Sequence, residues 1–410
     1  MQIILDVSRL VSRFLEKIEP TGVDRVTLAY AQHFSTTHAD STRALLRWRG
    51  LSGIFSARQS KVLFDVLLCG HRTASDRMAG CLVRGIVSTW FNGDGRRYLM
   101  LQTAHQDVET QEFWRIMRWH AFKPVFFVHD VIPISHPQFC RGDQENLHRL
   151  RLSKMQRSVG LITNSAASKA QLESFYRLSG HDTPPIKVGL LGIEEHAPKS
   201  ATGQPSRADA DIDSRAKTGD AQSPGYFICL GTIEPRKNHR LLLDVWRHLM
   251  ATMPEENLPV LKIIGQSGWG CEDIEAELLD ETWHRGKVQW LSDCADEELA
   301  HQLRGARALL FPTHVEGFGL PVAEALAAGT PVIASDLPVF KEFAANTPEY
   351  LNIDNLHAWA QAVMDYAAEG ERRRAQLDRI KQWQAPTWAH HFSVVTPWLE
   401  ALWQEHVGKA

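Results

Sequence analysis

Short apolar runs alternate with longer, more polar segments along most of this 410-residue chain. Continuous apolar runs of this kind are typical of strands that are buried on both faces of a parallel sheet. Such a run occupies residues 226–230, residues 125–128 indicate another buried strand, and residues 3–7 indicate the first strand of the chain. Their alternation with helical segments predicts an α/β fold built on parallel sheets.

A helical periodicity follows the first of these strands. Residues 20–26 open the segment, and Val23, Val26, Tyr30 and Phe34 recur at the spacing of one helix face. Such a stripe is expected to face the core, with polar residues on the opposite side.

A glycine turn flanked by two glutamates, at residues 314–324, is the most informative motif of the chain. Pro321 suits the first position of a helix and Gly329 suits the residue just past its end. A helix of about two turns is therefore expected, with Glu324 in its first turn and Glu316 on the loop that faces the same helix end.

The start of that helix is a candidate ligand site. Its exposed amides and positive dipole end favour phosphate or polarised hydroxyl groups. Gly317 and Gly319 allow a ligand to approach the backbone closely. Taken singly, Glu324 would only complement the helix dipole and Glu316 would be a solvated loop residue, so the neighbouring motifs decide between these interpretations.

A second loop carries two cations. The strand at residues 226–230 is followed by Gly231, Arg236 and Lys237, and then by a helix expected to run to about residue 249. An isolated Arg-Lys pair is usually a solvated surface feature. Its position after a strand favours a site, because open parallel sheets bind ligands at the carboxyl ends of their strands.

Histidines follow two strands of the first half in the same way. His129 and Asp130 end the apolar run at residues 125–128, and His105 follows another such run. A histidine at a strand end is more often structural than catalytic, but this sheet edge is where ligands lie. His129 and Asp130 are therefore candidate site residues, and His105 is a candidate border of an acceptor site.

The length exceeds what a single core usually serves, so two domains are expected. A polar segment rich in Ser, Ala and Asp predicts a flexible linker at residues 197–224. It separates a domain at residues 1–196 from a domain at 225–385, which is followed by a final segment at 386–410.

The formal net charge is −3, but the two parts of the chain differ. Up to Gly180 there are 24 Lys and Arg against 15 Asp and Glu, and beyond it 21 against 33. A basic half attracts anionic surfaces. Part of this charge is concentrated in Arg141, Arg149, Arg151, Lys154 and Arg157.

This charge suggests that the first domain docks on the anionic inner leaflet of the cytoplasmic membrane. A solvated helix face is the competing interpretation. Nucleic acid explains the charge less well, because no nucleic-acid-binding motif accompanies it. We find neither an apolar run of about 18 residues nor a signal peptide, so a cytoplasmic protein is expected.

Together these motifs resemble the retaining glycosyltransferases of family 4, which have the GT-B fold. The resemblance is specific over roughly residues 226–343 and fainter in the first half. It rests on residues 231–238, the strands at 260–265 and 287–292, the segment 306–312, the two-glutamate motif and the segment 329–335. Residues 21–26 and 128–133 look like those of bacterial mannosyl- or rhamnosyltransferases of O-antigen, capsule and exopolysaccharide assembly.

The resemblance implies two Rossmann-like domains facing across a cleft, with the C-terminal helix crossing back to the first domain. The first domain would bind the acceptor and the second a nucleoside diphosphate sugar. Arg236 and Lys237 would bind the diphosphate, Glu324 the ribose and Glu316 the donor sugar, while His129 would orient the donor. Further donor contacts are implied for Gly22, Gly231, Gly317, Phe318, Gly319, Leu320 and Leu291.

For Gly22, one glycine stands where the family usually has two, and a helix start that needs a small residue explains it equally well. The resemblance also implies metal-independent catalysis without a cofactor. The Asp-x-Asp matches within residues 209–213 lie in the predicted linker, which offers no rigid element to hold a metal ligand.

GDP-mannose is the favoured donor, and a saccharide or a polyprenyl-pyrophosphate-linked glycan is the expected acceptor. In the family the acceptor attacks from the face that the leaving group vacates, and the leaving phosphate takes its proton. A sugar-nucleotide epimerase, a phosphorylase and a non-catalytic sugar-nucleotide-binding scaffold of a polysaccharide assembly complex are the alternatives.

Overall fold

The computed structural model describes residues 1–48, 51–70, 78, 97–193 and 225–408. Two compact units make up the chain: Met1–Gly192 together with Thr387–Ala410, and Ile193–Pro386. The linker predicted at residues 197–224 lies outside the described residues.

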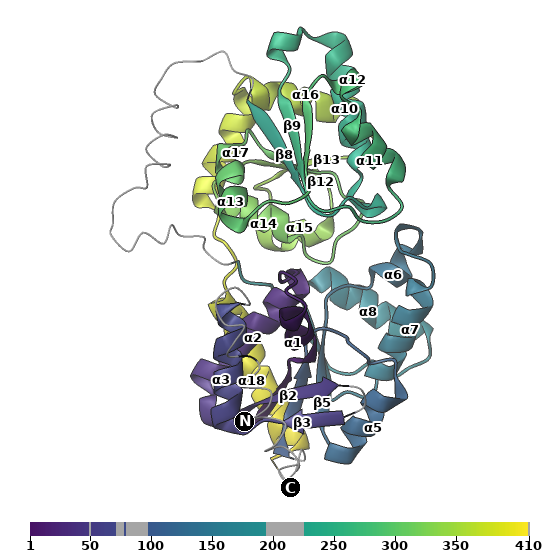
Figure 1. Cartoon of the computed structure of the whole chain (residues 1–410), viewed down its shortest axis with the longest axis vertical. Coiled ribbons are helices and arrows are strands. Elements are labelled where there is room, and N and C mark those ends of the chain that lie inside the picture. Colours follow the sequence, from purple (N-terminus) through teal and green to yellow (C-terminus); the bar gives the residue numbers. More distant parts are fainter. Residues whose placement is uncertain (49–50, 71–77, 79–96, 194–224, 409–410) are drawn as a thin grey trace, which may run out of the picture. The chain divides into compact units, whose positions relative to one another are not determined.

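The first unit is built on a seven-stranded sheet with the order β3-β2-β1-β4-β5-β6-β7. All neighbouring strands are parallel except β2 and β3. The strands are β1 (Ile3–Asp6), β2 (Thr42–Trp48), β3 (Leu51–Ile54), β4 (Leu99–Gln102), β5 (Lys123–Val128), β6 (Gly160–Thr163) and β7 (Ile186–Val188). The described helices of this unit are α1 (Ser8–Leu15), α2 (Gly22–Thr37), α3 (Ala57–Cys69), α5 (Gln111–His120), α6 (Ile132–Ser135), α7 (Gln144–Met155), α8 (Ala166–Leu178) and α18 (Trp388–His406) (Figure 1).

The second unit repeats the plan with a fully parallel six-stranded sheet, in the order β10-β9-β8-β11-β12-β13. Its strands are β8 (Tyr226–Leu230), β9 (Val260–Ile264), β10 (Val288–Leu291), β11 (Leu309–Phe311), β12 (Val332–Ser335) and β13 (Glu349–Leu351). The described helices are α10 (His239–Thr252), α11 (Glu272–Leu279), α12 (Glu281–His284), α13 (Asp296–Gly305), α14 (Leu320–Ala327), α15 (Pro338–Ala344), α16 (Leu356–Ala367) and α17 (Glu371–Gln382).

Each sheet is covered by helices on its faces, and the apolar runs of the sequence are its buried strands. All residues of β1, β4 and β12 are buried. The predicted inner face of α2 is also confirmed at Val26, Tyr30 and Phe34, which are buried. The two Rossmann-like units predicted from the sequence are therefore present (Figure 1).

The last helix, α18, belongs to the first unit, as expected for the C-terminal helix. Its Trp398 and Leu402 pack so tightly on Gly160 that an added Cβ would lie 2.7 and 2.8 Å from them. His391 of α18 is buried and its Nε2 lies 3.0 Å from the Tyr30 hydroxyl of α2. Because close packing and a buried hydrogen bond both tie α18 to this unit, the helix is part of its core.

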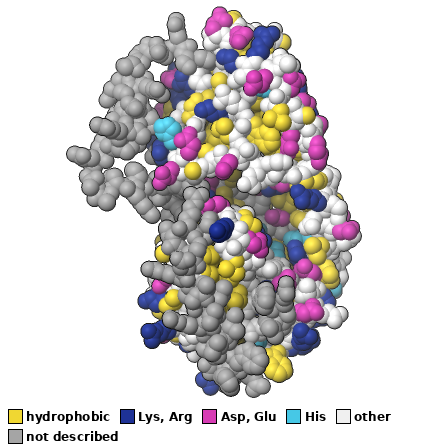
Figure 2. Space-filling model, viewed as in Figure 1, with side chains coloured by type: hydrophobic (Ala, Val, Ile, Leu, Met, Phe, Trp, Pro, Cys, Tyr) yellow, Lys and Arg dark blue, Asp and Glu magenta, His cyan; other side chains and the backbone are white. Residues whose placement is uncertain are grey.

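None of the helices in the described residues is long and apolar enough to cross a membrane. On the face drawn in Figure 2, acidic and basic side chains are interspersed over the second unit. On this face the acidic side chains therefore lie among basic ones rather than in one block.

Candidate active site

The carboxyl edge of the second sheet brings the two loop motifs together. β8 pairs with β9 on one side and with β11 on the other, so the chain order reverses between β8 and β11. In open α/β sheets ligands bind at such a reversal point. The Arg-Lys loop leaves β8 and the two-glutamate loop leaves β11 at this edge.

Glu316 lies at the centre of an ion cluster. One of its carboxylate oxygens is 2.6 Å from Nη1 of Arg236 and 2.5 Å from Nζ of Lys237. Nε of Arg236 also reaches the Glu234 carboxylate at 2.7 Å. Ion pairs with Glu316 therefore connect the Arg-Lys loop with the two-glutamate loop, which lies about 80 residues further along the chain.

Burial governs the electrostatics of this cluster. The side chains of Lys237 and Glu316 are only 9% and 10% exposed. Burial alone would raise the pKa of Glu316, but Lys237 and Arg236 hold it below its ordinary value. Burial lowers the pKa of Lys237, and the attraction of Glu316 opposes this shift. Glu316 is therefore ionised at neutral pH.

Neighbouring groups hold the cluster in place. The Thr313 hydroxyl lies 2.9 Å from the carbonyl oxygen of Arg236 and 3.3 Å from the Glu316 carboxylate. The backbone amide of His314 donates to the same Arg236 carbonyl at 2.8 Å. Nζ of Lys237 lies 4.7 Å from the centre of the Phe311 ring, a cation–π contact. Sequence reasoning missed Thr313, because a lone threonine after a strand carries no signal.

Two glycines allow the backbone to approach side chains closely, Gly231 at Lys237 and Gly319 at Phe340. Gly231 has φ +133, and a Cβ there would lie 3.3 Å from Cε of Lys237. Gly319 has φ +96, and a Cβ there would lie 2.4 Å from the Phe340 ring. Both positions favour glycine because an L side chain rarely adopts such φ values.

The helix after the glycine turn differs from the prediction in its first turn. Helix α14 begins at Leu320, with Gly319 as its N-cap, so Pro321 is its second residue. Glu324 is then the fifth residue and is not in the first turn, which holds no acidic residue. The early start arises because Gly319 takes up the positive φ that ends the loop. Gly329, with φ +76, does follow the helix as predicted.

At its observed position Glu324 still lies near the N-terminal end of α14, close to the glycine turn. It is half-buried, one turn into α14. Side chains of a helix tilt toward its N-terminus, so Glu324 is directed back toward the turn at residues 317–319. Leu291 ends β10, and its neighbour Trp290 donates from Nε1 to the carbonyl oxygen of Gly265 at 2.8 Å.

The carboxyl edge of the first sheet carries histidines after β4 and β5, next to a buried ion pair at the ends of β1 and β2, where Nε of Arg47 lies 2.7 Å from the Asp6 carboxylate. Nε2 of His129, directly after β5, lies 2.6 Å from the carbonyl oxygen of Thr103. Nε2 of His105, after β4, lies 2.5 Å from the carbonyl oxygen of Phe127. A carbonyl only accepts, so both Nε2 atoms carry the proton and donate.

A third histidine, His148 of α7, completes this group. Its ring centre lies 6.0 Å from that of His105, which lies 5.8 Å from that of His129. Burial lowers the pKa of all three, so each is neutral at pH 7. Sequence reasoning missed His148, because its place on a helix gave no reason to pair it with a strand end.

Asp130 has a structural partner. Its Oδ1 accepts from the backbone amide of Ile132 at 3.0 Å, at the start of α6. The Ser168 hydroxyl of α8 reaches the His129 carbonyl oxygen at 3.5 Å, close to the limit of a hydrogen bond. Asp130 thus shapes the loop that carries His129.

Gly22 is the first residue of α2, and its position is exposed. The helix is capped by Thr21, whose amide and hydroxyl both donate to the Asp24 carboxylate, at 2.8 and 2.7 Å. Asp24 is fully buried and also pairs with Arg9 and Arg13 of α1, each at 2.9 Å. The structure therefore shows Gly22 at a capped helix start, and the phosphate contact stays a prediction. Sequence reasoning missed the role of Asp24.

The described residues contain no group of three or more His, Cys, Asp or Glu side chains placed to hold a metal ion.

Comparison with known families identifies the second half of the chain. Residues 211–383 match the family model described as "Glycosyl transferases group 1". The "Serotype-specific mannosyltransferase WbdA" of Escherichia coli is 30% identical over 282 residues, which are 65% of this chain and 32% of that protein. The "O-antigen chain mannosyltransferase B" of Escherichia coli is 35% identical over 112 residues, 27% of this chain and 29% of that protein. The chain thus spans about a third of the length of these relatives, or less.

Solved structures match over nearly the whole chain. The Anabaena protein Alr3699/HepE, solved in complex with UDP and glucose, aligns with a TM-score of 0.63 and 16% identity, covering 98% of this chain and 100% of that one. A sucrose-phosphate synthase from Thermosynechococcus elongatus aligns with a TM-score of 0.61 and 16% identity, covering 98% and 99%. At this identity the likeness shows a shared fold.

Proposed function

From the match of residues 211–383 to the glycosyl transferases group 1 model, within a chain of GT-B fold, we propose that the protein transfers a hexose from a nucleoside diphosphate sugar to a saccharide acceptor. The observation that carries the proposal is the cluster of Arg236, Lys237 and Glu316 at the reversal point of the second sheet. Two buried or half-buried cations at that edge suit a diphosphate, and one ionised carboxylate suits sugar hydroxyls.

In this proposal the second unit binds the donor. Arg236 and Lys237 bind the diphosphate, and Glu316 accepts hydrogen bonds from the donor sugar while the amides of residues 318–320 support it. Glu324 accepts from the ribose hydroxyls, and the nucleobase lies near Leu291. Gly231 keeps the backbone close to Lys237, where an added Cβ would lie 3.3 Å from Cε.

The chemical role of the cations is to stabilise the leaving group. As the bond between the anomeric carbon and the phosphate oxygen lengthens, negative charge grows on the diphosphate, where Arg236 and Lys237 already point. The pairing with Glu316 keeps both cations ordered before the donor arrives. Preorganisation of this kind avoids reorganisation during the reaction.

We further propose that transfer retains the anomeric configuration and needs no metal ion or cofactor. His129 donates from Nε2 to the Thr103 carbonyl, and burial lowers its pKa, so it acts as a neutral polar group that orients the donor hexose. The acceptor hydroxyl then loses its proton to the departing phosphate.

The relatives favour mannose as the transferred sugar. Two of those matched at 30% identity or more are named mannosyltransferases, and one name refers to O-antigen chains. We therefore propose GDP-mannose as donor and a saccharide or polyprenyl-pyrophosphate-linked glycan as acceptor, in the synthesis of a cell-surface polysaccharide. The same proposal locates the chain in the cytoplasm, in peripheral contact with the anionic inner leaflet.

Two other functions would use the same donor site. A sugar-nucleotide epimerase would convert the donor into its epimeric sugar nucleotide without a saccharide acceptor, and a non-catalytic scaffold would bind the donor without turning it over. The three functions differ in what happens to the donor after it is bound.

The test is incubation of the purified chain with GDP-, UDP- and dTDP-sugars, with and without EDTA, while release of nucleoside diphosphate is measured. EDTA-resistant release from GDP-mannose, stimulated by a mannose-containing acceptor, is the expected result. Product linkage by NMR then tests retention. Donor binding without turnover under all acceptor conditions would favour the scaffold, and acceptor-independent epimerisation would favour the epimerase.

A further inference from the structure

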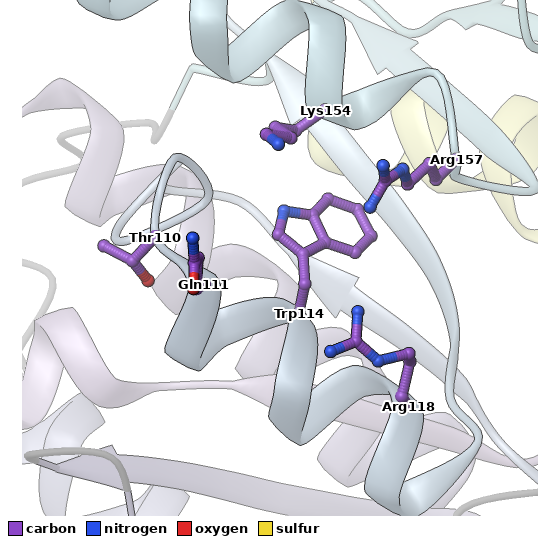
Figure 3. A pocket seen from close by; sticks show the side chains of 6 residues that line it. All are labelled: Thr110, Gln111, Trp114, Arg118, Lys154 and Arg157. Carbon is purple, nitrogen blue, oxygen red and sulfur yellow. The ribbon is translucent and has the colours of Figure 1, made fainter.

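A cationic pocket lies in the first unit between α5 and α7, and none of its lining residues is among those assigned to the donor. Its volume is about 190 Å³. Its lining consists of Thr110, Gln111, Trp114, Arg118, Lys154 and Arg157. Figure 3 shows the three cationic side chains arranged around the indole ring of Trp114.

The indole is a fixed floor for this pocket. Trp114 is only 6% exposed, and its Nε1 donates to the carbonyl oxygen of Val108 at 2.8 Å. The guanidinium carbon of Arg157 lies 5.5 Å from the ring centre, within cation–π range. Thr110 is also fixed, because its hydroxyl caps α5 at the amide of Phe113.

Lys154 and Arg157 belong to the basic segment at residues 141–157, in which two neighbouring arginines are paired with glutamates. Arg149 is paired with Glu145 at 2.8 Å, and Arg151 is paired with Glu109 at 2.8 Å. None of the six lining residues is acidic. Three positive charges therefore converge on one concave site whose own lining supplies no counter-charge, which favours an anionic occupant.

The composition of the site selects a phosphate group among anions. Two guanidinium groups and one ammonium group are the side chains that recognise phosphate, the first by paired hydrogen bonds and the second as a point charge. The volume of about 190 Å³ leaves room for a phosphate group among the three cations.

We propose that the Trp114 pocket binds a phosphate group, carried either by a small soluble molecule or by a phospholipid headgroup. The pocket belongs to the first unit and is separate from the diphosphate site proposed around Arg236 and Lys237. Binding there does not depend on the chain being a glycosyltransferase.

The test compares two variants of equal net charge. K154Q/R157Q removes two cations from the pocket, and K61Q/R177Q removes two exposed cations from α3 and α8. Binding of inorganic phosphate to the full chain is measured by calorimetry. We expect K154Q/R157Q to lose about 100-fold in affinity, because each of the two lost charge-assisted contacts is worth about a factor of ten. K61Q/R177Q should bind as the unchanged chain does.

A vesicle arm distinguishes the two sources of phosphate. Cosedimentation is measured with vesicles of phosphatidylcholine alone and with an equal mixture of phosphatidylcholine and phosphatidic acid. Retention on the acidic vesicles that K154Q/R157Q loses and K61Q/R177Q keeps identifies a headgroup. Pocket-dependent binding of inorganic phosphate alone identifies a soluble ligand.

Equal behaviour of the two double variants toward both probes, or binding of neither probe by the unchanged chain, would overturn the proposal. R118Q provides an independent variant on the other helix, and it should weaken the same probe. Circular dichroism of each variant verifies that these substitutions leave the fold intact.

Discussion

The two sheets of this protein present different chemistry at equivalent edges. In the second unit the loops after β8 and β11 carry a buried ion cluster of Arg236, Lys237 and Glu316. In the first unit the segments after β4 and β5 carry His105 and His129, which donate to backbone carbonyl oxygens. The ion cluster is the centre of the second edge, whereas the first edge combines these neutral imidazoles with the buried ion pair of Asp6 and Arg47.

Burial explains both outcomes, because it disfavours a charged group unless an opposite charge is near. Glu316 keeps its charge because two cations surround it, and its pKa is lowered. At His129 burial outweighs the attraction of Asp130, and at His105 it outweighs the hydrogen bond to the Phe127 carbonyl, so the pKa of each histidine is lowered. The comparison teaches that a buried group at either edge keeps its charge where opposite charges offset desolvation, as at Glu316 and Arg47, and is neutral where they do not, as at His105 and His129.

The largest expected effect follows from removing the buried cation of the charged edge. Lys237→Ala should lower turnover by about 1,000-fold, the upper range for one preorganised stabilising group. It should also lower the free energy of unfolding by about 3 kcal/mol, because Glu316 loses a buried partner. Donor turnover and urea unfolding measure the two effects.

A paired substitution separates these two effects. Adding Glu316→Gln to Lys237→Ala should recover much of the stability, since the unpaired charge is gone, but none of the turnover. Lys381→Ala, an exposed lysine of α17, is the control. Normal turnover in Lys237→Ala would remove the assignment of the diphosphate to this edge.

The buried neutral histidines of the first unit should make its free energy of unfolding sensitive to acid. Burial lowers the pKa of His391 to about 4, below its value of about 6.5 in the unfolded chain. The unfolded state therefore binds the proton more readily, and stability is lost as the pH falls from about 6.5 to about 4. Linkage gives a loss of about 3 kcal/mol for this one group.

Urea unfolding at pH 7 and near pH 4.5 measures that loss, with His391→Gln as the test variant. The variant is less stable at pH 7 because contacts to Tyr30 and Leu190 are changed. Its stability should nevertheless depend less on pH than that of the unchanged chain. An identical pH dependence in the two proteins would contradict a neutral buried His391.

Arg236→Ala should have a smaller effect on turnover than Lys237→Ala. Arg236 is 23% exposed, so solvent screens part of its charge, and Glu316 retains Lys237 when it is removed. We expect about a 100-fold loss of turnover with little change in urea midpoint. A loss equal to that of Lys237→Ala would show that the two cations act as one unit.

The smallest expected effect is that of His129. His129→Asn should lower turnover about tenfold, because an orienting hydrogen-bonding group is lost while the leaving-group contacts remain. The unchanged enzyme should show no titration of His129 in kcat between about pH 6 and pH 8, since its pKa is lowered. A pH profile of kcat that loses an ionisation near neutrality in His129→Asn would show that His129 titrates in the reaction.

Much of this architecture could be predicted from local pattern. The strand predicted at residues 226–230 is β8 with the same bounds, and the run at 125–128 lies within β5. These predictions hold because a strand buried on both faces must be apolar throughout. Arg236, Lys237 and His129 could be identified as candidates because each follows a strand whose end is visible in the sequence.

Other features could not be read from the sequence. The first turn of α14 was misplaced because the φ of Gly319 is set by its loop and by the packing of Phe340. Thr313 and His148 were missed, because each reaches its partners through the sheet edge rather than along the chain. The pairing of Arg149 and Arg151, and the convergence of Lys154 and Arg157 on Trp114, were equally invisible.

The sequence by itself therefore determined the α/β class, the two Rossmann-like units and the motifs that carry charge and glycine to the strand ends. Periodicity and turn chemistry are local properties, so they can be recognised in the linear sequence. Only the tertiary structure decided which of those groups meet and which stay ionised. Ion pairing across about 80 residues and desolvation both depend on what the fold brings within a few ångströms of each group.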